Sequence, residues 1–194
     1  MKMNIIIAGV GGQGILLASR VLGCLAMAEG NDVKVSEVHG MSQRGGDVIT
    51  HVRIGEEVYS PLIEEGTADV VIAFEQLEAL RALPLLKRGG RIIVNTQKMM
   101  PMPVLTGAAS YPEDIMEKLE AHGSVLALDA MAVAKACGVE RAVNIVLLGA
   151  FASTQAIAKE AWLQAVETCV PKRAADANRE AFVMGWRIAN EHNA

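Results

Sequence analysis

The feature that most constrains the fold is a glycine-rich turn, Gly9-Val10-Gly11-Gly12-Gln13-Gly14. An apolar run, residues 5–8, precedes it, and residues 15–22 after it carry apolar side chains at helical spacing. The order of strand, glycine turn and helix is the context in which a G-x-G-x-x-G motif places backbone N–H groups against a phosphate. The sequence therefore predicts an α/β fold. It also favours a ligand or interface role for the turn over a purely conformational role for its glycines.

A dinucleotide-binding domain is one alternative, and it requires an acidic residue at the end of the second strand. Glu37 is the nearest candidate, at the end of a predicted strand over residues 32–38. The chain then enters another glycine-rich loop instead of a crossover helix. This departure argues against an NAD-dependent enzyme, which we keep as the runner-up interpretation.

The second glycine-rich loop, residues 39–47, is the other candidate binding segment. Gly45 and Gly46 expose backbone N–H groups, and Arg44 can hold a phosphate or a carboxylate through two hydrogen bonds. Ser42 adds a hydroxyl group. A solvated surface loop explains the same composition equally well.

We expect the whole chain, residues 1–194, to form one domain with a three-layer, Rossmann-like α/β fold. Residues 48–54 alternate as a strand, and we expect residues 58–60 to pair back on it as a β-hairpin, which makes the sheet mixed. From about residue 142 onward the chain reads as helical, so we expect a helical C-terminal third. A buried helix over residues 143–158 contains Gly149, which indicates one close backbone contact.

A proline-broken loop, residues 98–103, carries three methionines. It cannot be a central element of the sheet, because its prolines lack backbone donors. The methionines could form an adaptable contact surface or fold under the loop as local core, and we favour the local core.

Composition excludes several classes of protein. The net charge of −4 and an aromatic content of 4% argue against a nucleic-acid binder. No apolar run is long enough to cross a bilayer and no signal peptide is visible, so we expect a cytoplasmic protein without a membrane partner. Cys24, Cys137 and Cys169 lie far apart in the sequence, which predicts buried free thiols and no metal or iron–sulfur centre built by this chain alone.

Three stretches together resemble one family. The turn over residues 9–14 resembles the GxGGQG signature of the gamma-type subunit of 2-oxoacid:ferredoxin oxidoreductases. Residues 37–46, with Tyr59-Ser60-Pro61-Leu62-Ile63 further on, look like the version in the beta subunit of indolepyruvate-type members. Asn144 with Leu148-Gly149-Ala150 is similar to a later motif of the family.

The resemblance implies a subunit that is not active alone. In that family a 2-oxoacid is oxidatively decarboxylated to its coenzyme A thioester, and electrons pass to ferredoxin. The resemblance places thiamine diphosphate, Mg²⁺ and iron–sulfur clusters in a larger alpha subunit. We expect no catalytic or metal-ligating residue in this chain. The expected binding residues are Gly9 and two polar walls. The walls are Gly11, Gly12, Gln13 and Gly14 on one side and Ser42, Arg44, Gly45 and Gly46 on the other.

The two walls have two possible ligands, coenzyme A phosphates or carboxylates of the partner subunit. A third interpretation is a purely structural partner, in which the glycines only allow another chain to pack closely. The sequence leaves the 2-oxoacid and the stoichiometry of the complex open.

Overall fold

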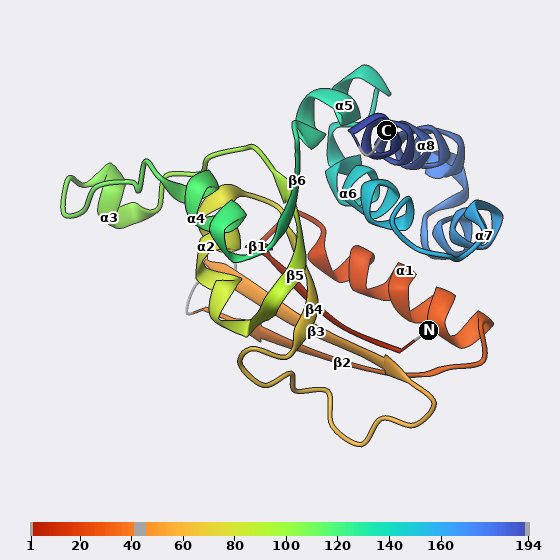
Figure 1. The fold of residues 1–194 in the computed structure, drawn as a ribbon. Helices are drawn as coiled ribbons and strands as arrows, with labels where there is room; N and C mark the ends of the chain where they lie inside the picture. The colour runs from red at the N-terminus through yellow and green to blue at the C-terminus, as the bar shows by residue number, and fades with distance from the viewer. Residues whose placement is uncertain (1, 41–45, 193–194) are drawn as a thin grey trace.

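The computed structural model describes residues 2–40 and 46–192 (Figure 1). In this part of the chain, six strands form one sheet with the order β2-β3-β1-β4-β5-β6. The strands are β1 (Met3–Val10), β2 (Asp32–His39), β3 (Asp47–Gly55), β4 (Ala68–Ala73), β5 (Leu86–Asn95) and β6 (Ser124–Leu128). β1, β4, β5 and β6 pair in parallel, whereas β3 is antiparallel to both of its neighbours, β1 and β2. The predicted mixed sheet is confirmed.

The β-hairpin lies one strand earlier than predicted. β3 pairs with β2, from Asp32 opposite Gly55 to His39 opposite Val48, and residues 58–60 form no strand. The predicted hairpin over residues 48–60 is therefore wrong. The physical reason is that β1 and β2 already occupy both edges of β3, so no backbone donors or acceptors are left for a returning strand. The Val58 N–H instead donates to Asp32 Oδ2, at 2.9 Å.

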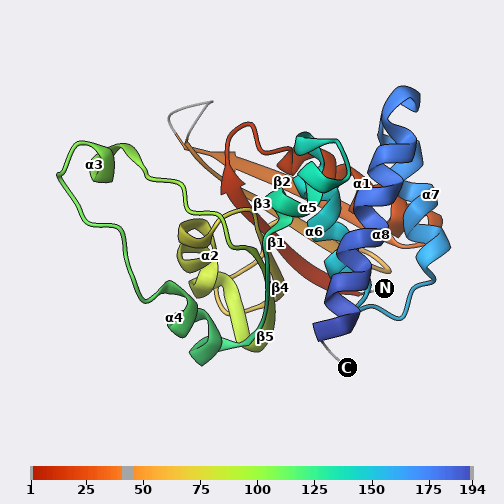
Figure 2. The ribbon, with the colours of Figure 1, turned by 90° about the horizontal axis from the view of Figure 1, so that it is seen from above.

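Helices cover both faces of the sheet, which confirms the three-layer arrangement (Figures 1 and 2). Alternate residues of β1 enter the two cores, because successive side chains of a strand point to opposite faces. Ile5 and Ile7 pack toward α1 (Ile15–Ala28) and the C-terminal helices, and Ile6 and Ala8 pack toward α2 and α4. The helices of this second face are α2 (Gln76–Ala82), which continues as a 3₁₀ turn η1 (Leu83–Leu85), and α4 (Ile115–His122).

α1 starts at Ile15, directly after the glycine turn. Gly12 and Gly14 have φ angles of +102° and +86°, in the left-handed region, so the glycine turn extends to Gly14 before the helix begins at Ile15. The helix ends at Ala28, and Gly30 follows with a φ of +75°, as expected for a glycine beyond a helix end.

After β6, every regular element in the described residues is helical, which confirms the helical C-terminal third. The elements are α5 (Ala130–Ala136), η2 (Glu140–Ala142), α6 (Val143–Ala152), α7 (Lys159–Cys169), η3 (Lys172–Ala174) and α8 (Ala175–His192). α6 is shorter than the predicted range of 143–158. The hydroxyl groups of Ser153 and Thr154 donate to the carbonyl oxygens of Ala150 and Phe151, which closes the last turn of the helix.

The close backbone contact predicted for Gly149 is present between α6 and α8. A Cβ atom at Gly149 would collide with the backbone carbonyl of Phe182, and one at Gly185 would collide with the backbone carbonyl of Val146. Two glycines thus let the two helices cross at short range, and every residue of α6 is buried.

The segment between β5 and α4 extends away from the sheet and carries the short helix α3 (Met102–Leu105) (Figures 1 and 2). Our preference for a local methionine core is wrong here, because Met100, Met102 and Leu105 are 45%, 67% and 65% exposed. α3 has only four residues and none of them is buried, so it is too short to cover the methionine side chains of its own segment. Only Met99 of the three predicted core methionines is half-buried.

Candidate functional site

The glycine turn leaves the carboxyl end of β1 and is closed by its own glutamine. Gln13 Oε1 accepts a hydrogen bond from the Val10 N–H at 2.7 Å, and Gln13 Nε2 donates to Met99 Sδ at 3.2 Å. A Cβ atom at Gly9 would lie 2.7 Å from Gln13 Oε1 and 2.9 Å from Phe74 Cβ. Gly9 and Gln13 therefore shape the turn, and both polar ends of the Gln13 side chain are bonded within the chain.

Two backbone amides of the turn are the candidates for holding an anion. The Gly11 and Gln13 N–H groups donate to the carbonyl oxygens of Gly46 and Val10. For the Gly12 and Gly14 N–H groups, we find no acceptor among the described residues. Both glycines stand just before the positive end of the α1 dipole, and the first turn of α1 has no acidic side chain.

The two glycine-rich loops touch one another. The Gly11 N–H donates to the Gly46 carbonyl oxygen at 2.9 Å, and the Gly40 N–H donates to the Asp47 carbonyl oxygen at 2.9 Å, where β2 and β3 meet. Gly46 is therefore placed beside the first loop as the two-wall prediction requires. The other predicted residues of this loop, Ser42, Arg44 and Gly45, lie outside the described residues.

A distant asparagine holds the start of α1. Asn144, in the first turn of α6, donates from Nδ2 to the Gly14 carbonyl oxygen at 3.0 Å, across 130 positions of sequence. The same oxygen accepts the N–H groups of Leu17 and Ala18. Because the Asn144 side chain is only 1% exposed, its amide can form this bond in a defined orientation.

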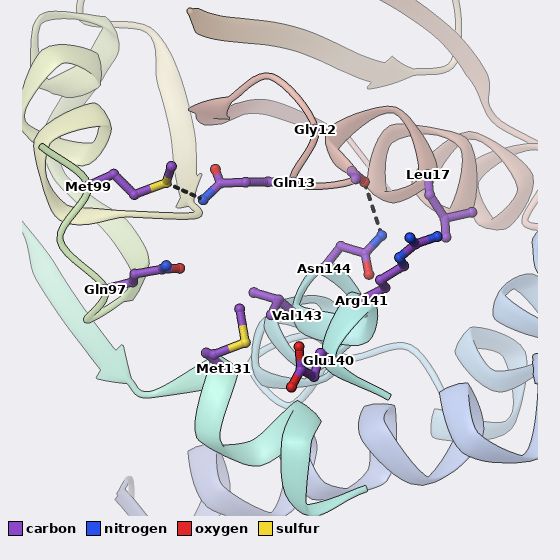
Figure 3. A pocket seen from close by; sticks show the side chains of 11 residues that line it. Gly12, Gln13, Leu17, Gln97, Met99, Met131, Glu140, Arg141, Val143 and Asn144 are labelled. Atoms are coloured by element: carbon purple, nitrogen blue, oxygen red, sulfur yellow. Dashed lines mark hydrogen bonds between the residues drawn. The ribbon is translucent and has the colours of Figure 1, made fainter. Parts of the chain in front are cut away.

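A pocket of about 560 Å³ opens beside this contact (Figure 3). One side is the glycine turn with α1, the second is the segment after β5, and the third is the region from α5 to α6. The lining residues are Gly12, Gln13, Gly14, Leu17, Gln97, Met99, Met131, Glu140, Arg141, Val143 and Asn144. Three predicted site residues, Gly12, Gln13 and Gly14, therefore line one cavity together.

Arg141 gives the pocket a cation that the sequence analysis did not single out. It lies in η2, directly before α6, and its side chain is exposed with no ion pair to a described residue. Its neighbour Glu140 also lines the pocket. One signal was available in the sequence, since Arg141 stands three positions before Asn144, but only the fold shows that residue 144 reaches the glycine turn.

The buried carboxylate of Glu75 holds one segment of the pocket lining in place. The Glu75 carboxylate caps α2, accepting from the Glu78 N–H at 2.5 Å, and its other oxygen accepts from the Met99 N–H at 3.3 Å and the Tyr111 hydroxyl at 3.5 Å. Burial, together with the Glu75 charge, raises the pKa of Tyr111 to about 12, so its hydroxyl stays protonated and can donate. Glu75 thus positions Met99, whose sulfur in turn holds Gln13.

The carboxylate of Glu78, in the first turn of α2, has fewer hydrogen bonds than that of Glu75. Glu78 is 3% exposed, and one of its oxygens bonds Arg81 at 2.6 Å. The other oxygen, Oε2, has no hydrogen-bond partner among the described residues. Burial raises the pKa of Glu78, as expected for a carboxylate that has lost water.

Glu37 does not occupy the position that an NAD site requires. In a dinucleotide-binding sheet the second strand is next to the first, but here β3 separates β2 from β1. Glu37 instead accepts a hydrogen bond from Thr50 Oγ1 at 3.2 Å and pairs with His39 at 2.6 Å. The strand order therefore removes the geometric support for the NAD interpretation.

The described residues contain no group of three or more His, Cys, Asp or Glu side chains that could hold a metal ion. None of their helices combines the length and the apolar character that crossing a membrane requires.

Comparison with known proteins identifies the family. The family model for pyruvate ferredoxin/flavodoxin oxidoreductase matches residues 4–188. The chain belongs to this family. An indolepyruvate oxidoreductase subunit IorB from Thermococcus kodakarensis is 42% identical over 98% of this chain and 97% of its own length. The pyruvate/ketoisovalerate oxidoreductases common subunit gamma from Thermococcus litoralis is 30% identical over 90% of this chain and 92% of its own length.

Solved structures of pyruvate ferredoxin/flavodoxin oxidoreductase relatives share the fold. The gamma subunit of a keto/oxoacid ferredoxin oxidoreductase from Geobacter sulfurreducens superimposes with a TM-score of 0.74 at 27% identity, covering 98% of this chain and 99% of that one. A 2-oxoglutarate:ferredoxin oxidoreductase from Magnetococcus marinus gives a TM-score of 0.75 at 21% identity, and this chain matches 32% of its length. The resemblance seen in the sequence is confirmed, and the chain is a subunit of a 2-oxoacid:ferredoxin oxidoreductase.

Proposed function

We propose that this chain is the small subunit of an indolepyruvate-type, aryl pyruvate-oxidising member of the family. The observation that carries the proposal is a difference in identity. Relatives named indolepyruvate oxidoreductase subunit IorB are 42% and 43% identical over 98% of the chain, whereas the pyruvate/ketoisovalerate gamma subunits reach 30% over 90%. Two small subunits that serve the same substrate and bind the same kind of large partner are expected to share a higher sequence identity than two that share only the fold.

The proposed reaction converts a 2-oxoacid, coenzyme A and two oxidised ferredoxins into an acyl-coenzyme A thioester, carbon dioxide, one proton and two reduced ferredoxins. We assign thiamine diphosphate, Mg²⁺ and the iron–sulfur clusters to a larger alpha subunit. There, thiamine diphosphate would supply an electron sink for the decarboxylation, and the clusters would supply the electron path to ferredoxin. The cytoplasm is the compartment we expect for this complex.

In this proposal the chain contributes the coenzyme A side of the site. The amides of Gly12 and Gly14, just before α1, have no acceptor among the described residues and are suited to a phosphate. Arg141 adds a full positive charge in the same pocket. The Gly11–Gly46 contact supports the second wall, because Gly46, one of its proposed residues, hydrogen-bonds to the first loop. We propose Ser42, Arg44 and Gly45 as the other residues of this wall. The competing assignment gives both walls to carboxylates of the partner subunit.

The test is reconstitution. We expect the chain co-expressed with its large partner to catalyse coenzyme A-dependent ferredoxin reduction with indolepyruvate at a higher kcat/KM than with pyruvate. Omitting either subunit should abolish the reaction. Turnover by this chain alone would refute the subunit assignment. A preference of the complex for pyruvate would refute only the assignment of the substrate.

A further inference from the structure

Two thiols that are 145 positions apart in the sequence meet between α1 and α7. Cys24 Sγ and Cys169 Sγ are 3.1 Å apart. Cys24 belongs to the second half of α1, and Cys169 is the last residue of α7. Both are free thiols, as predicted, but they are half-buried and not buried.

The contact is fixed by the core rather than by flexible loops. Val21 of α1, three residues before Cys24, and Val166 of α7, three residues before Cys169, are both 0% exposed. The two side chains belong to one hydrophobic cluster. Since residues three and four apart share a helix face, the packing of these apolar residues also brings the two sulfurs together.

We propose that Cys24 and Cys169 form a reversible disulfide, with a low-molecular-weight disulfide such as glutathione disulfide as the oxidant. The thiolate of one cysteine attacks the oxidant and releases one glutathione thiolate, which leaves a mixed disulfide. The second cysteine then attacks the protein sulfur of this mixed disulfide and releases the second glutathione thiolate. The two protons that the cysteines lose are taken up by the two glutathione thiolates, the two sulfurs are oxidised by two electrons in all, and glutathione disulfide is reduced to two glutathione molecules.

The surroundings of the two thiols set the order of these steps. Burial, with the hydrogen bond to Cys24 as the second cause, raises the pKa of Cys169 to about 12. The position of Cys169 at the carboxyl end of α7, where the helix dipole is negative, also disfavours its thiolate. Cys24 therefore makes the first attack and Cys169 resolves the mixed disulfide. The sulfurs must approach by about 1 Å to reach bonding distance.

The bond would tie the C-terminal helical layer to the helix that starts at the glycine turn. It closes a loop that contains most of the chain, and such a closure restricts the unfolded state strongly. We expect the oxidised protein to melt higher than the reduced protein, by on the order of 10 °C.

Cys137 provides the matched control. It is also a half-buried free thiol, and burial raises its pKa too, but in the described part of the chain it has no hydrogen bond to another sulfur. A Cys137→Ser variant therefore keeps the proposed pair, whereas Cys24→Ser and Cys169→Ser remove it.

The experiment treats the full chain with glutathione disulfide under native conditions, then counts free thiols and maps linked peptides by mass spectrometry. We expect wild type to fall from three free thiols to one, and Cys137→Ser to fall from two to none, with a peptide linked through Cys24 and Cys169 in both. Dithiothreitol should restore the thiols and the lower Tm. Cys24→Ser and Cys169→Ser should yield no intramolecular cross-link.

Two results on wild type itself would overturn the proposal, so it does not depend on how well a variant folds. One is a chain that keeps all three thiols, and the other is a chain that accumulates the mixed disulfide with glutathione without closing. A cross-link through Cys137 would overturn it as well, because it would show that proximity in the fold does not select the pair.

Discussion

Asn144 Nδ2 lies 3.0 Å from the Gly14 carbonyl oxygen, and this bond joins the C-terminal helical layer to the glycine turn. It fixes the start of α1 relative to α6, so the amides of the turn and the Arg141 side chain face one pocket (Figure 3). The family motif in the turn and the later motif around residue 144 thus form a single structural unit.

Asn144→Ala tests this unit through stability. The variant removes the donor to Gly14 and the acceptor of the Ile145 N–H, in a side chain that is 1% exposed, so we expect a loss of about 1–3 kcal/mol in the free energy of unfolding. Urea unfolding measures the loss. Gln164→Ala, at an exposed position of α7, is the control and should stay within about 0.5 kcal/mol of wild type. Equal losses in the free energy of unfolding for the two variants would show that the Asn144 hydrogen bonds do not stabilise the fold.

Gly14→Ala should lower the free energy of unfolding by more than left-handed backbone strain alone would. Gly14 has a φ of +86°, and an added Cβ would lie 2.7 Å from Asn144 Nδ2. Gly138 has a φ of +75° with nothing within 4 Å of an added Cβ, so Gly138→Ala isolates the backbone strain, which is about 1–2 kcal/mol.

A double-mutant cycle then measures the contact. In an Asn144→Ala background the clash is absent, and we expect the Gly14→Ala effect to fall to that of Gly138→Ala. Fully additive effects of the Gly14 and Asn144 substitutions in equilibrium unfolding would show that the two residues do not interact.

His51 predicts a pH dependence of stability. Its Nδ1 accepts the Ile63 N–H at 3.1 Å, it is 9% exposed, and burial lowers its pKa below the usual 6.5. The unfolded chain therefore binds a proton more readily than the folded chain. The stability from neutral His51 is fully present above pH 6.5 and is lost as the pH falls below that value, at no more than about 1.4 kcal/mol per pH unit.

His51→Asn is the matched variant, since Asn Oδ1 can accept the same hydrogen bond but cannot be protonated in this range. Urea unfolding at pH 8, 6.5 and 5.5 should show a steeper decline for wild type than for the variant. Parallel curves would mean that His51 titrates in the same way in the folded and the unfolded chain.

Gly149→Ala should destabilise the crossing of α6 and α8. The new methyl group would collide with the Phe182 carbonyl, and we expect a loss of about 2 kcal/mol or more despite the better helix propensity of alanine. Gly23→Ala in α1 meets nothing within 4 Å, so it should stabilise by about 0.5–1 kcal/mol. Thermal unfolding of the two variants should therefore move in opposite directions, and a shift of both in the same direction would contradict the close crossing.

Local patterns with a single physical cause could be predicted from the sequence. Gly149, in an otherwise apolar helix, correctly predicted a close backbone contact, and the run from Gly9 to Gly14 correctly predicted a turn between strand and helix. The hairpin was misplaced because pairing is not local. Residues 58–60 have strand-like composition, but β2 takes the edge of β3 that they would need.

The candidate site was found only in part for the same reason. Gly12, Gln13 and Gly14 are adjacent in the sequence, so one motif reveals them together. Gln97, Met131 and Arg141 reach the same pocket from three other segments. No local pattern marks Gln97 or Met131, and the position of Arg141 three residues before Asn144 has meaning only once the fold is known. The role of these residues depends on how β5, α5 and η2 are placed by the sheet and by the Asn144 contact.

The last prediction concerns the two arginines in the reconstituted complex. If Arg141 and Arg44 hold coenzyme A phosphates, replacing either with alanine removes a charge-assisted hydrogen bond of about 1.5–3 kcal/mol, so the KM for coenzyme A should rise roughly 10–100-fold. The KM for the 2-oxoacid should not change, since this pocket would not bind it. Arg88→Ala, at an exposed position in β5, is the control and should leave both constants at the wild-type level. An unchanged KM for coenzyme A, combined with weaker association of the two subunits, would instead assign the arginines to the subunit interface.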